Sequence, residues 1–291
     1  MVHGIADLPP ASDERALPWA MERLTGAGVS ECALEARLLL GLATGASQAQ
    51  ILSGLRRELN ATERERLLSL VRRRCAREPL AYLRGSQEFY GLEFCVDRNV
   101  LIPRPETELL VAFAIDLLRG GASTVFADVG TGSGCVAVSV AITVPQARAV
   151  ATDVSRYAAR VARANAERHR VSERVLVVVG DLLSAVRPRS LDLVLSNPPY
   201  IATSDVSGLQ AEVRDWEPRI ALDGGEDGLS IVRRLAREAR HALKRDGRLA
   251  LEVALGQGRS VAKELSESGY GHIGTLRDLA GIERVVHGML A

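Results

Sequence analysis

The second half of the chain alternates short apolar runs with stretches of helical periodicity. The apolar runs are Thr124 to Val129, Ala147 to Asp153, Val175 to Val179, Leu191 to Ser196 and Gly247 to Val253. Such alternation is typical of an α/β fold built on a doubly wound, mainly parallel sheet with helices on both faces. Two further runs, Ile273 to Arg277 and Glu283 to Gly288, predict an antiparallel edge. Ligands of such sheets bind beyond the carboxyl ends of the strands.

The residues before this sheet follow a helical pattern. Apolar side chains recur at helical spacing from about Pro18 to Glu78, which predicts a small all-helical domain over residues 1–85. Aromatic and β-branched residues around Gly91 predict a β-hairpin linker over residues 86–102. The sheet domain then occupies residues 103–291. We expect the helical domain and the hairpin to dock a partner.

One predicted helix has clear end signals. Asn60, with Glu63 three residues later, is the pattern of a capped helix start. The run Arg72, Arg73 and Arg74 fits the last turn of that helix, where the dipole favours positive charge. We expect these three arginines to be solvated, and a contact with RNA or an acidic partner is the alternative.

Composition limits the classes of function. The 291 residues carry a formal net charge of +1, so no global field would attract nucleic acid or an anionic membrane. The four cysteines lack metal-ligand spacing, which predicts neither a zinc site nor a disulfide framework. No basic segment followed by an apolar stretch begins at Met1, and no apolar run has membrane-spanning length. We expect a soluble cytoplasmic protein without a metal.

A glycine-rich segment follows the first predicted strand. Gly130, Thr131, Gly132, Ser133 and Gly134 form a G-x-G-x-G loop that leads into a helix. Alternate glycines let a backbone turn tightly and approach a ligand. Cys135 stands where a dinucleotide-binding fingerprint needs its third glycine, so a nucleoside without a pyrophosphate fits better than NAD.

Acidic residues end the second and third strands. Asp153 lies about twenty residues beyond the glycine loop, the separation at which an acid usually accepts the ribose hydroxyls. Asp181 can accept from an adenine amino group, and Leu182 beside it can cover the ring. Either acid alone could be a cap or turn residue. Three successive strand ends that supply a glycine loop and two acids predict an adenosine pocket.

The fourth strand ends in Asn197-Pro198-Pro199-Tyr200. Two prolines remove two backbone donors and hold the chain extended, so the Asn197 amide and the carbonyls beside it stay free for a ligand. A rigid exit from the strand is the purely structural alternative. Because the strands meet at one edge of the sheet, we expect Asn197 beside the reactive end of the cofactor.

These residues resemble the class I S-adenosylmethionine-dependent methyltransferases, with their Rossmann-like sheet, and within them the bacterial release-factor protein-(glutamine-N5) methyltransferases. The resemblance covers nearly the whole chain. The matching segments are Phe89 to Gly91, Ile102 to Glu108, Gly130 to Gly134, Asp153, Asp181, Asn197 to Tyr200 and Leu222 to Leu229. The Arg104 to Thr107 segment followed by the glycine loop is the most specific part.

The resemblance implies transfer of a methyl group from S-adenosylmethionine to the glutamine side-chain nitrogen in the GGQ motif of peptide chain release factors 1 and 2, which leaves S-adenosylhomocysteine. It implies no direct nucleic acid or membrane partner, and we expect a monomer. The implied cofactor residues are Gly130, Thr131, Gly132, Ser133, Gly134, Asp153, Leu182 and Asn197, and the argument from the strand ends adds Asp181. The implied substrate residues are Asn197, Pro198, Pro199 and Tyr200, of which Asn197, Pro198 and Tyr200 are catalytic.

Two positions depart from the family pattern. Leu182 replaces an aromatic residue, so adenine stacking becomes apolar packing, and Ala254 replaces a glycine after Glu252, with Gln257 still in place.

Three alternatives remain at this point. A nucleic-acid methyltransferase acting on adenine N6 or guanine N2 would use the same type of tetrapeptide, but it must also capture a base. A glutamine methyltransferase of a ribosomal protein would differ only in its docking partner. A noncatalytic cofactor-binding module is the third alternative, and the intact Asn197 and both prolines argue against it.

Overall fold

The computed structural model describes residues 8–54, 57–120 and 123–290. The residues at Met1, on which the expectation of no leader depends, lie outside these ranges. The chain divides into two compact units. The first comprises Met1–Gly85 and Ala211–Trp216, and the second comprises Ser86–Gln210 and Glu217–Ala291. The short segment Ala211–Trp216 therefore groups with the helical unit, although the sequence places it within the sheet domain.

The first unit is helical, as predicted. Its helices are α1 (Asp13–Gly26), α2 (Cys32–Thr44), α3 (Gln48–Leu52), α4 (Ala61–Cys75), α5 (Leu80–Arg84) and α9 (Ala211–Arg214). Leu24, Leu39, Leu67 and Val71 form much of the shared core between α1, α2 and α4. This unit buries its own apolar faces, which gives it a core of its own.

The capped start of α4 is confirmed. The Glu63 backbone N–H donates to Asn60 Oδ1 at 3.0 Å, and the Asn60 backbone N–H donates to Glu63 Oε2 at 2.9 Å. Both donors would otherwise be unsatisfied at the first turn of the helix.

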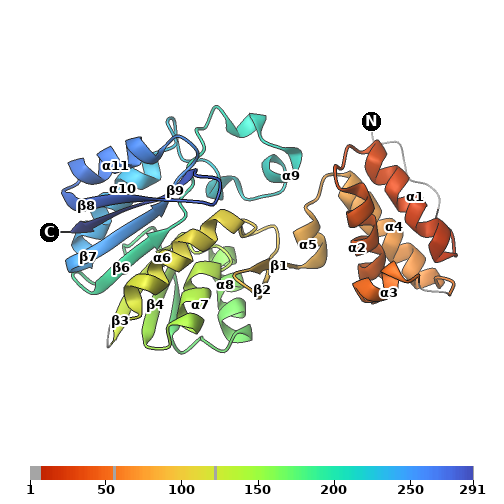
Figure 1. Cartoon of the computed structure of the whole chain (residues 1–291), viewed down its shortest axis with the longest axis horizontal. Coiled ribbons are helices and arrows are strands. Elements are labelled where there is room, and N and C mark those ends of the chain that lie inside the picture. Colours follow the sequence, from red (N-terminus) through yellow and green to blue (C-terminus); the bar gives the residue numbers. More distant parts are fainter. Residues whose placement is uncertain (1–7, 55–56, 121–122, 291) are drawn as a thin grey trace. The chain divides into compact units, whose positions relative to one another are not determined.

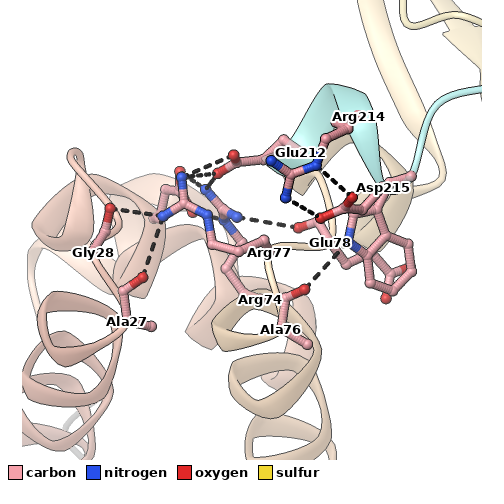
Figure 2. Close-up of polar contacts among 11 residues, drawn as sticks. Ala27, Gly28, Arg74, Ala76, Arg77, Glu78, Glu212, Arg214 and Asp215 are labelled. Carbon is pink, nitrogen blue, oxygen red and sulfur yellow. Dashed lines mark hydrogen bonds and ion pairs between the residues drawn. The ribbon is translucent and has the colours of Figure 1, made fainter. Parts of the chain in front are cut away.

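The prediction that the arginine run is solvated is wrong for Arg74. Its side chain is only 6% exposed and forms ion pairs with Glu35 at 2.5 Å and with Glu212 at 2.9 Å. Figure 2 shows Glu212, from α9, reaching both Arg74 and Arg77, and Trp216 Nε1 donates to the Ala76 carbonyl at 3.2 Å. A carboxylate 138 positions away in the sequence pairs with this arginine, so no local pattern could reveal its burial.

The second unit contains a seven-stranded sheet of order β5-β4-β3-β6-β7-β9-β8. The strands are β3 (Thr124–Val129), β4 (Ala147–Asp153), β5 (Val175–Val179), β6 (Leu191–Ser196), β7 (Leu243–Glu252), β8 (Tyr270–Arg277) and β9 (Glu283–Leu290). The first five are parallel, and β9 runs antiparallel to both β7 and β8. The predicted doubly wound sheet with an antiparallel edge is confirmed. β7 begins at Leu243, before the predicted Gly247, because an irregular register extends its pairing with β6.

Helices cover both faces of this sheet (Figure 1). α6 (Glu108–Leu118), α7 (Cys135–Thr143) and α8 (Arg156–Arg168) share one core with Phe126, whereas α10 (Ser230–Ala242) and α11 (Gly258–Glu267) share the other with Ala127. Neighbouring residues of β3 thus point into opposite cores, as the alternation of side chains along a strand requires. The hairpin is confirmed as β1 (Ser86–Phe89) and β2 (Leu92–Cys95).

The strand order fixes where a ligand can bind. The chain moves outward from β3 through β4 to β5 and then returns to place β6 on the other side of β3. Such a switch point leaves a crevice at the carboxyl ends of the two central strands, which is where open α/β sheets bind ligands. The glycine loop follows β3 and Asn197 follows β6, so both flank that crevice.

No helix within the described ranges is long and apolar enough to cross a membrane. All four cysteines are free thiols.

Candidate active site

A cavity of about 320 Å³ lies at the carboxyl ends of the parallel strands. A pocket of this size lies in the range that small molecules and cofactors occupy. Eight of the residues predicted from the sequence line it, namely Gly130, Gly132, Asp153, Asp181, Leu182, Asn197, Pro198 and Pro199. The structure therefore brings four strand ends to one cavity.

The glycine loop is held against the end of β4. The backbone N–H groups of Gly130 and Thr131 both donate to the Thr152 carbonyl, at 2.9 and 3.0 Å. The Gly132 N–H donates to Asp153 Oδ2 at 2.9 Å. These three amides are thus used within the protein and do not form an open cradle for phosphate. The loop therefore suits a nucleoside better than a pyrophosphate, in agreement with the argument from spacing.

Three residues of the loop lie outside the main cavity. Thr131 and Ser133 line a smaller neighbouring cavity together with Asn197. Gly134 has φ +81°, and a Cβ there would lie 3.2 Å from Cβ of Ala162, so this glycine allows α7 and α8 to pack closely. Gly134 lines neither cavity.

Asp153 joins the loop to the cavity. Its Oδ2 accepts from Gly132, and its Oδ1 accepts from the Ser155 backbone N–H at 2.8 Å. A carboxylate has about four acceptor sites, so two remain for a diol. Burial raises the pKa of Asp153, and the two backbone donors oppose that rise.

Asp181 and Leu182 form the outer part of the cavity wall. Asp181 is exposed, and its Oδ2 accepts from Arg234 Nη2 at 2.7 Å. Leu182 has φ +47°, a left-handed conformation that is strained for a side chain branched at Cγ. The chain tolerates this strain where it presents an apolar side chain to the cavity.

The end of β6 is fixed on both sides. The Ser196 hydroxyl donates to the Val129 carbonyl at 2.7 Å, which joins β6 to β3. The Asn197 Nδ2 donates to Thr107 Oγ1 at 3.1 Å. Among the hydrogen bonds of the described chain, none ends on Asn197 Oδ1 or on the Pro198 carbonyl. Two acceptors are therefore free at the cavity wall, as the two prolines predicted.

Tyr200 is anchored through its backbone. Gln257 Nε2 donates to the Tyr200 carbonyl at 2.9 Å. A Cβ at Gly228, which has φ +74°, would lie 2.3 Å from that same oxygen, so only glycine fits there. Burial, followed by the negative charge of Glu252, raises the pKa of Tyr200 to about 12. The phenol is therefore neutral at physiological pH, and Tyr200 does not line the main cavity.

Several wall residues were not predicted. They are Asn99, Val100, Leu101, Val154, Ser155, Ala158, Pro218, Ile220, Ala221, Ile231 and Arg234. Most lie in loops or on the first turns of helices, where no local pattern marks a ligand contact. Glu252 is the last residue of β7, which pairs with β6. The expected order of the strands was the one indication in the sequence that Glu252 lies near Asn197.

No group of three His, Cys, Asp or Glu side chains within residues 8–54, 57–120 and 123–290 could hold a metal ion.

Comparison with known proteins decides the family. The profile of the PrmC N-terminal domain matches residues 15–85, and that of the methyltransferase small domain matches residues 107–212. A release factor glutamine methyltransferase from Geobacter sulfurreducens is 40% identical over 276 residues, which cover 95% of this chain and 96% of that protein. One from Gloeobacter violaceus is 43% identical over 271 residues, covering 92% and 94%. The chain belongs to the release factor glutamine methyltransferase family.

The fold of this family member also resembles solved structures outside the family. The N-terminal domain of human METTL16, solved in complex with SAH, aligns with a TM-score of 0.51 at 18% identity, covering 69% of this chain and 77% of that one. At that identity the likeness supports the methyltransferase fold alone. The family membership confirms the resemblance drawn from the Arg104 to Thr107 segment and the glycine loop.

Proposed function

We propose that this chain transfers a methyl group from S-adenosylmethionine to the side-chain amide nitrogen of the glutamine in the GGQ motif of release factors. One observation carries the proposal: two free acceptors, Asn197 Oδ1 and the Pro198 carbonyl, lie beside a cavity suited to a nucleoside. A primary amide offers two N–H donors, which match two acceptors.

The cavity residues fit S-adenosylmethionine. Asp153 retains acceptor sites for the ribose hydroxyls, and Leu182 and Val154 offer apolar contact to the base. Asp181 lies on the same rim as Leu182 and can accept from an exocyclic amine. Four of the five loop amides, those of Gly130, Thr131, Gly132 and Gly134, are already bonded within the protein, in agreement with a cofactor that has no phosphate. We propose Gly130, Thr131, Gly132, Ser133 and Gly134 as the loop that shapes this part of the site, with Gly134 acting through packing.

The protein's own part in the reaction is to bind and aim the substrate amide. An amide nitrogen is a poor nucleophile because its lone pair is delocalised into the carbonyl. Asn197 Oδ1 and the Pro198 carbonyl each accept one N–H, Pro199 keeps the segment extended, and Tyr200 packs on the planar amide. Fixing donor and acceptor in line is worth up to roughly 7 to 11 kcal/mol of the barrier when the geometry is good.

The bound cofactor supplies a methyl group activated on a sulfonium. Transfer of that methyl group to the substrate nitrogen would break its C–S bond, with the electron pair going to sulfur, and would leave S-adenosylhomocysteine. The substrate nitrogen releases one proton to water. The two acceptors polarise the N–H bonds as positive charge develops on nitrogen, so no histidine or cysteine base is needed.

We propose release factors 1 and 2 as the partners of a monomeric, cytoplasmic enzyme that binds neither nucleic acid nor membrane directly. The formal net charge of +1 supports this, because a nucleic-acid enzyme usually carries a basic surface. Incubation with labelled S-adenosylmethionine and either release factor or nucleic acid, followed by autoradiography, separates these substrates. Label at the GGQ glutamine is the expected result, and label on nucleic acid or on a ribosomal protein alone would overturn it.

Asn197→Ala tests the catalytic assignment. The change removes one of the two acceptors, so we expect methyl transfer to be abolished while S-adenosylmethionine affinity stays within a few-fold of the wild-type value. Calorimetry measures the affinity, and a tritiated-methyl assay measures the transfer. Near-normal turnover would remove Asn197 from the mechanism.

A further inference from the structure

We propose that Thr107 and Glu252 are positioning residues which fix the end of the Asn197 amide that faces the substrate. The inference rests on the proposed function, in which Asn197 Oδ1 accepts an N–H of the substrate glutamine. It adds two residues that lie outside the main cavity and act through Asn197.

The three side chains come from three different elements. Asn197 follows β6, whose last residue Ser196 pairs with Leu251 of β7, so Asn197 stands beside Glu252. Thr107 ends the 3-10 helix η1 (Pro105–Thr107). Its hydroxyl accepts from Asn197 Nδ2 at 3.1 Å. The same hydroxyl lowers the pKa of Glu252, which places it close to that buried carboxyl group. These three side chains, Glu252, Thr107 and Asn197, therefore form a series that runs from the end of the sheet to the cavity.

The direction of these hydrogen bonds follows from the chemistry of the groups. When Glu252 is ionised its carboxylate can only accept, and we infer that Thr107 then donates its single hydroxyl proton to it. The hydroxyl then has only lone pairs to offer to Asn197, and it selects the NH₂ end of that amide. Oδ1 is consequently turned the other way, where no partner within the described residues competes for it.

Burial makes this arrangement hard to replace. Thr107 is 3% exposed and Glu252 is 2% exposed, so water has little access to either. Within the described chain, Glu252 Oε2 has no hydrogen-bond partner at all. Loss of the Thr107 hydroxyl would leave a buried carboxylate with one donor fewer and the Asn197 NH₂ without its acceptor.

A flipped Asn197 amide would be inactive by the same reasoning. It would present NH₂ to the substrate NH₂, so donor would face donor and only the Pro198 carbonyl would remain as an acceptor. A primary amide has two nearly isosteric ends, and packing alone distinguishes them poorly. The hydrogen-bond direction set by Glu252 supplies the discrimination.

Two variants of Thr107 separate positioning from packing. Thr107→Val keeps the shape and removes the hydroxyl, whereas Thr107→Ser keeps the hydroxyl and removes a methyl group. At about pH 8.5, above the pKa of about 7 of Glu252, we expect Thr107→Val to lower kcat about a hundredfold. S-adenosylmethionine affinity should stay within about twofold of wild type, and Thr107→Ser should restore kcat to within about threefold. Equal losses in both variants, or equal activity in both, would overturn the proposal.

A second readout does not depend on methyl transfer. Selective ¹⁵N labelling of asparagine gives a side-chain amide signal that Asn197→Ala identifies by its loss. We expect exchange of these amide protons with water to be faster in Thr107→Val than in wild type, and unchanged in Thr107→Ser. An unchanged rate in Thr107→Val would overturn the positioning role even if the enzyme methylates release factors. Absence of transfer by the wild-type protein, with the expected exchange rates, would instead contradict the proposed function.

Discussion

Glu252 shows how one buried side chain links the stability of the fold to its active site. It is 2% exposed, and burial raises its pKa from 4.5 to about 7. The Thr107 hydroxyl, Arg284 and Arg104 oppose that rise, whereas Glu106 adds to it. Tyr200 also lies within reach of its charge. A carboxylate in this position costs stability whenever it is ionised.

The pH dependence of unfolding follows from that pKa. The folded state binds the proton of Glu252 more tightly than the unfolded chain does. The resulting stabilisation of the folded state is therefore complete below pH 4.5 and is lost as the pH rises through about 7. We expect the free energy of unfolding of wild type to fall over this range by about 3 kcal/mol more than that of Glu252→Gln. Urea titrations at a series of pH values measure the difference.

The control for this prediction is Glu267→Gln, a change at an exposed side chain of α11. Its profile should follow wild type. Parallel profiles for wild type and Glu252→Gln would show that Glu252 does not titrate in this range.

Asp153 permits a second prediction about a single residue. Its two oxygens already hold Gly132 and Ser155, and its remaining acceptor sites face the cavity. We expect Asp153→Ala to weaken S-adenosylmethionine binding about tenfold to a hundredfold, since hydrogen bonds to charged groups are worth roughly 1.5 to 3 kcal/mol. Calorimetry measures the affinity, and thermal unfolding of the same variant shows whether the loop remains folded. Unchanged affinity would place the ribose elsewhere.

The sequence did not predict that α9 belongs to the helical unit. This helix has only four residues and no buried side chain of its own. Its position depends on Glu212, whose carboxylate lies 2.9 Å from Arg74 and 2.7 Å from Arg77 (Figure 2). Burial opposes ionisation of Glu212, but hydrogen bonds from its backbone, Arg74 and Arg77 outweigh it and lower the pKa. Ion pairs rather than apolar contacts therefore hold this element.

Glu212→Gln should release α9 from the helical unit. Among the described residues the change leaves Glu35 as the one remaining ion-pair partner of the buried Arg74, and we expect a loss of about 1 to 3 kcal/mol in the free energy of unfolding. In a Trp19→Phe background Trp216 is the only tryptophan, so its emission in a urea titration reports on this segment. The urea concentration at the midpoint of this emission change should be lower in Glu212→Gln than in the Trp19→Phe background protein.

Asp215→Asn is the matched control on the same segment. Its ion pair with Arg214 is about half exposed on both sides, and exposed pairs contribute little. The midpoint should stay close to wild type. Equal shifts in the two variants would mean that burial of the pair does not matter.

At the scale of the whole molecule, the chain enters the helical unit twice. After Gln210 it leaves the second unit, contributes Ala211–Trp216 to the first, and returns at Glu217. Glu217 is 5% exposed and pairs with Arg104 at 2.6 Å, and the next residues, Pro218, Ile220 and Ala221, line the cavity. The segment held by Arg74 is thus continuous in sequence with a wall of the active site.

Deletion of residues up to Gly85 tests the proposed docking role of the helical unit. The second unit has its own two cores and contains every residue that lines the main cavity, so we expect cofactor affinity to persist. Methylation of intact release factor should fall steeply, because the docking surface is gone and α9 has lost Arg74 and Arg77. Calorimetry and the tritiated-methyl assay measure the two effects. Full activity on release factor would refute the docking role.

Much of the catalytic unit could be predicted because its signals are local. β3, β4, β5 and β6 begin and end at the predicted residues, since glycines, acids and Asn197 interrupt each apolar run. Each strand end points to the same edge of a parallel sheet, and so the ligand side was predictable too. The start of β7 was not, because its pairing with β6 continues across an irregular register.

Sequence alone determined the doubly wound sheet, the helical domain before it and the residues that end its strands, since periodicity and turn chemistry are properties of neighbouring residues. Only the tertiary structure decided that Arg74 is buried by Glu212, and that Thr107 and Glu252 stand behind Asn197. These contacts join side chains from separate elements, and the direction of a hydrogen bond depends on which groups meet. The two acceptors could therefore be predicted from the sequence, whereas the orientation of the Asn197 amide depends on the tertiary structure.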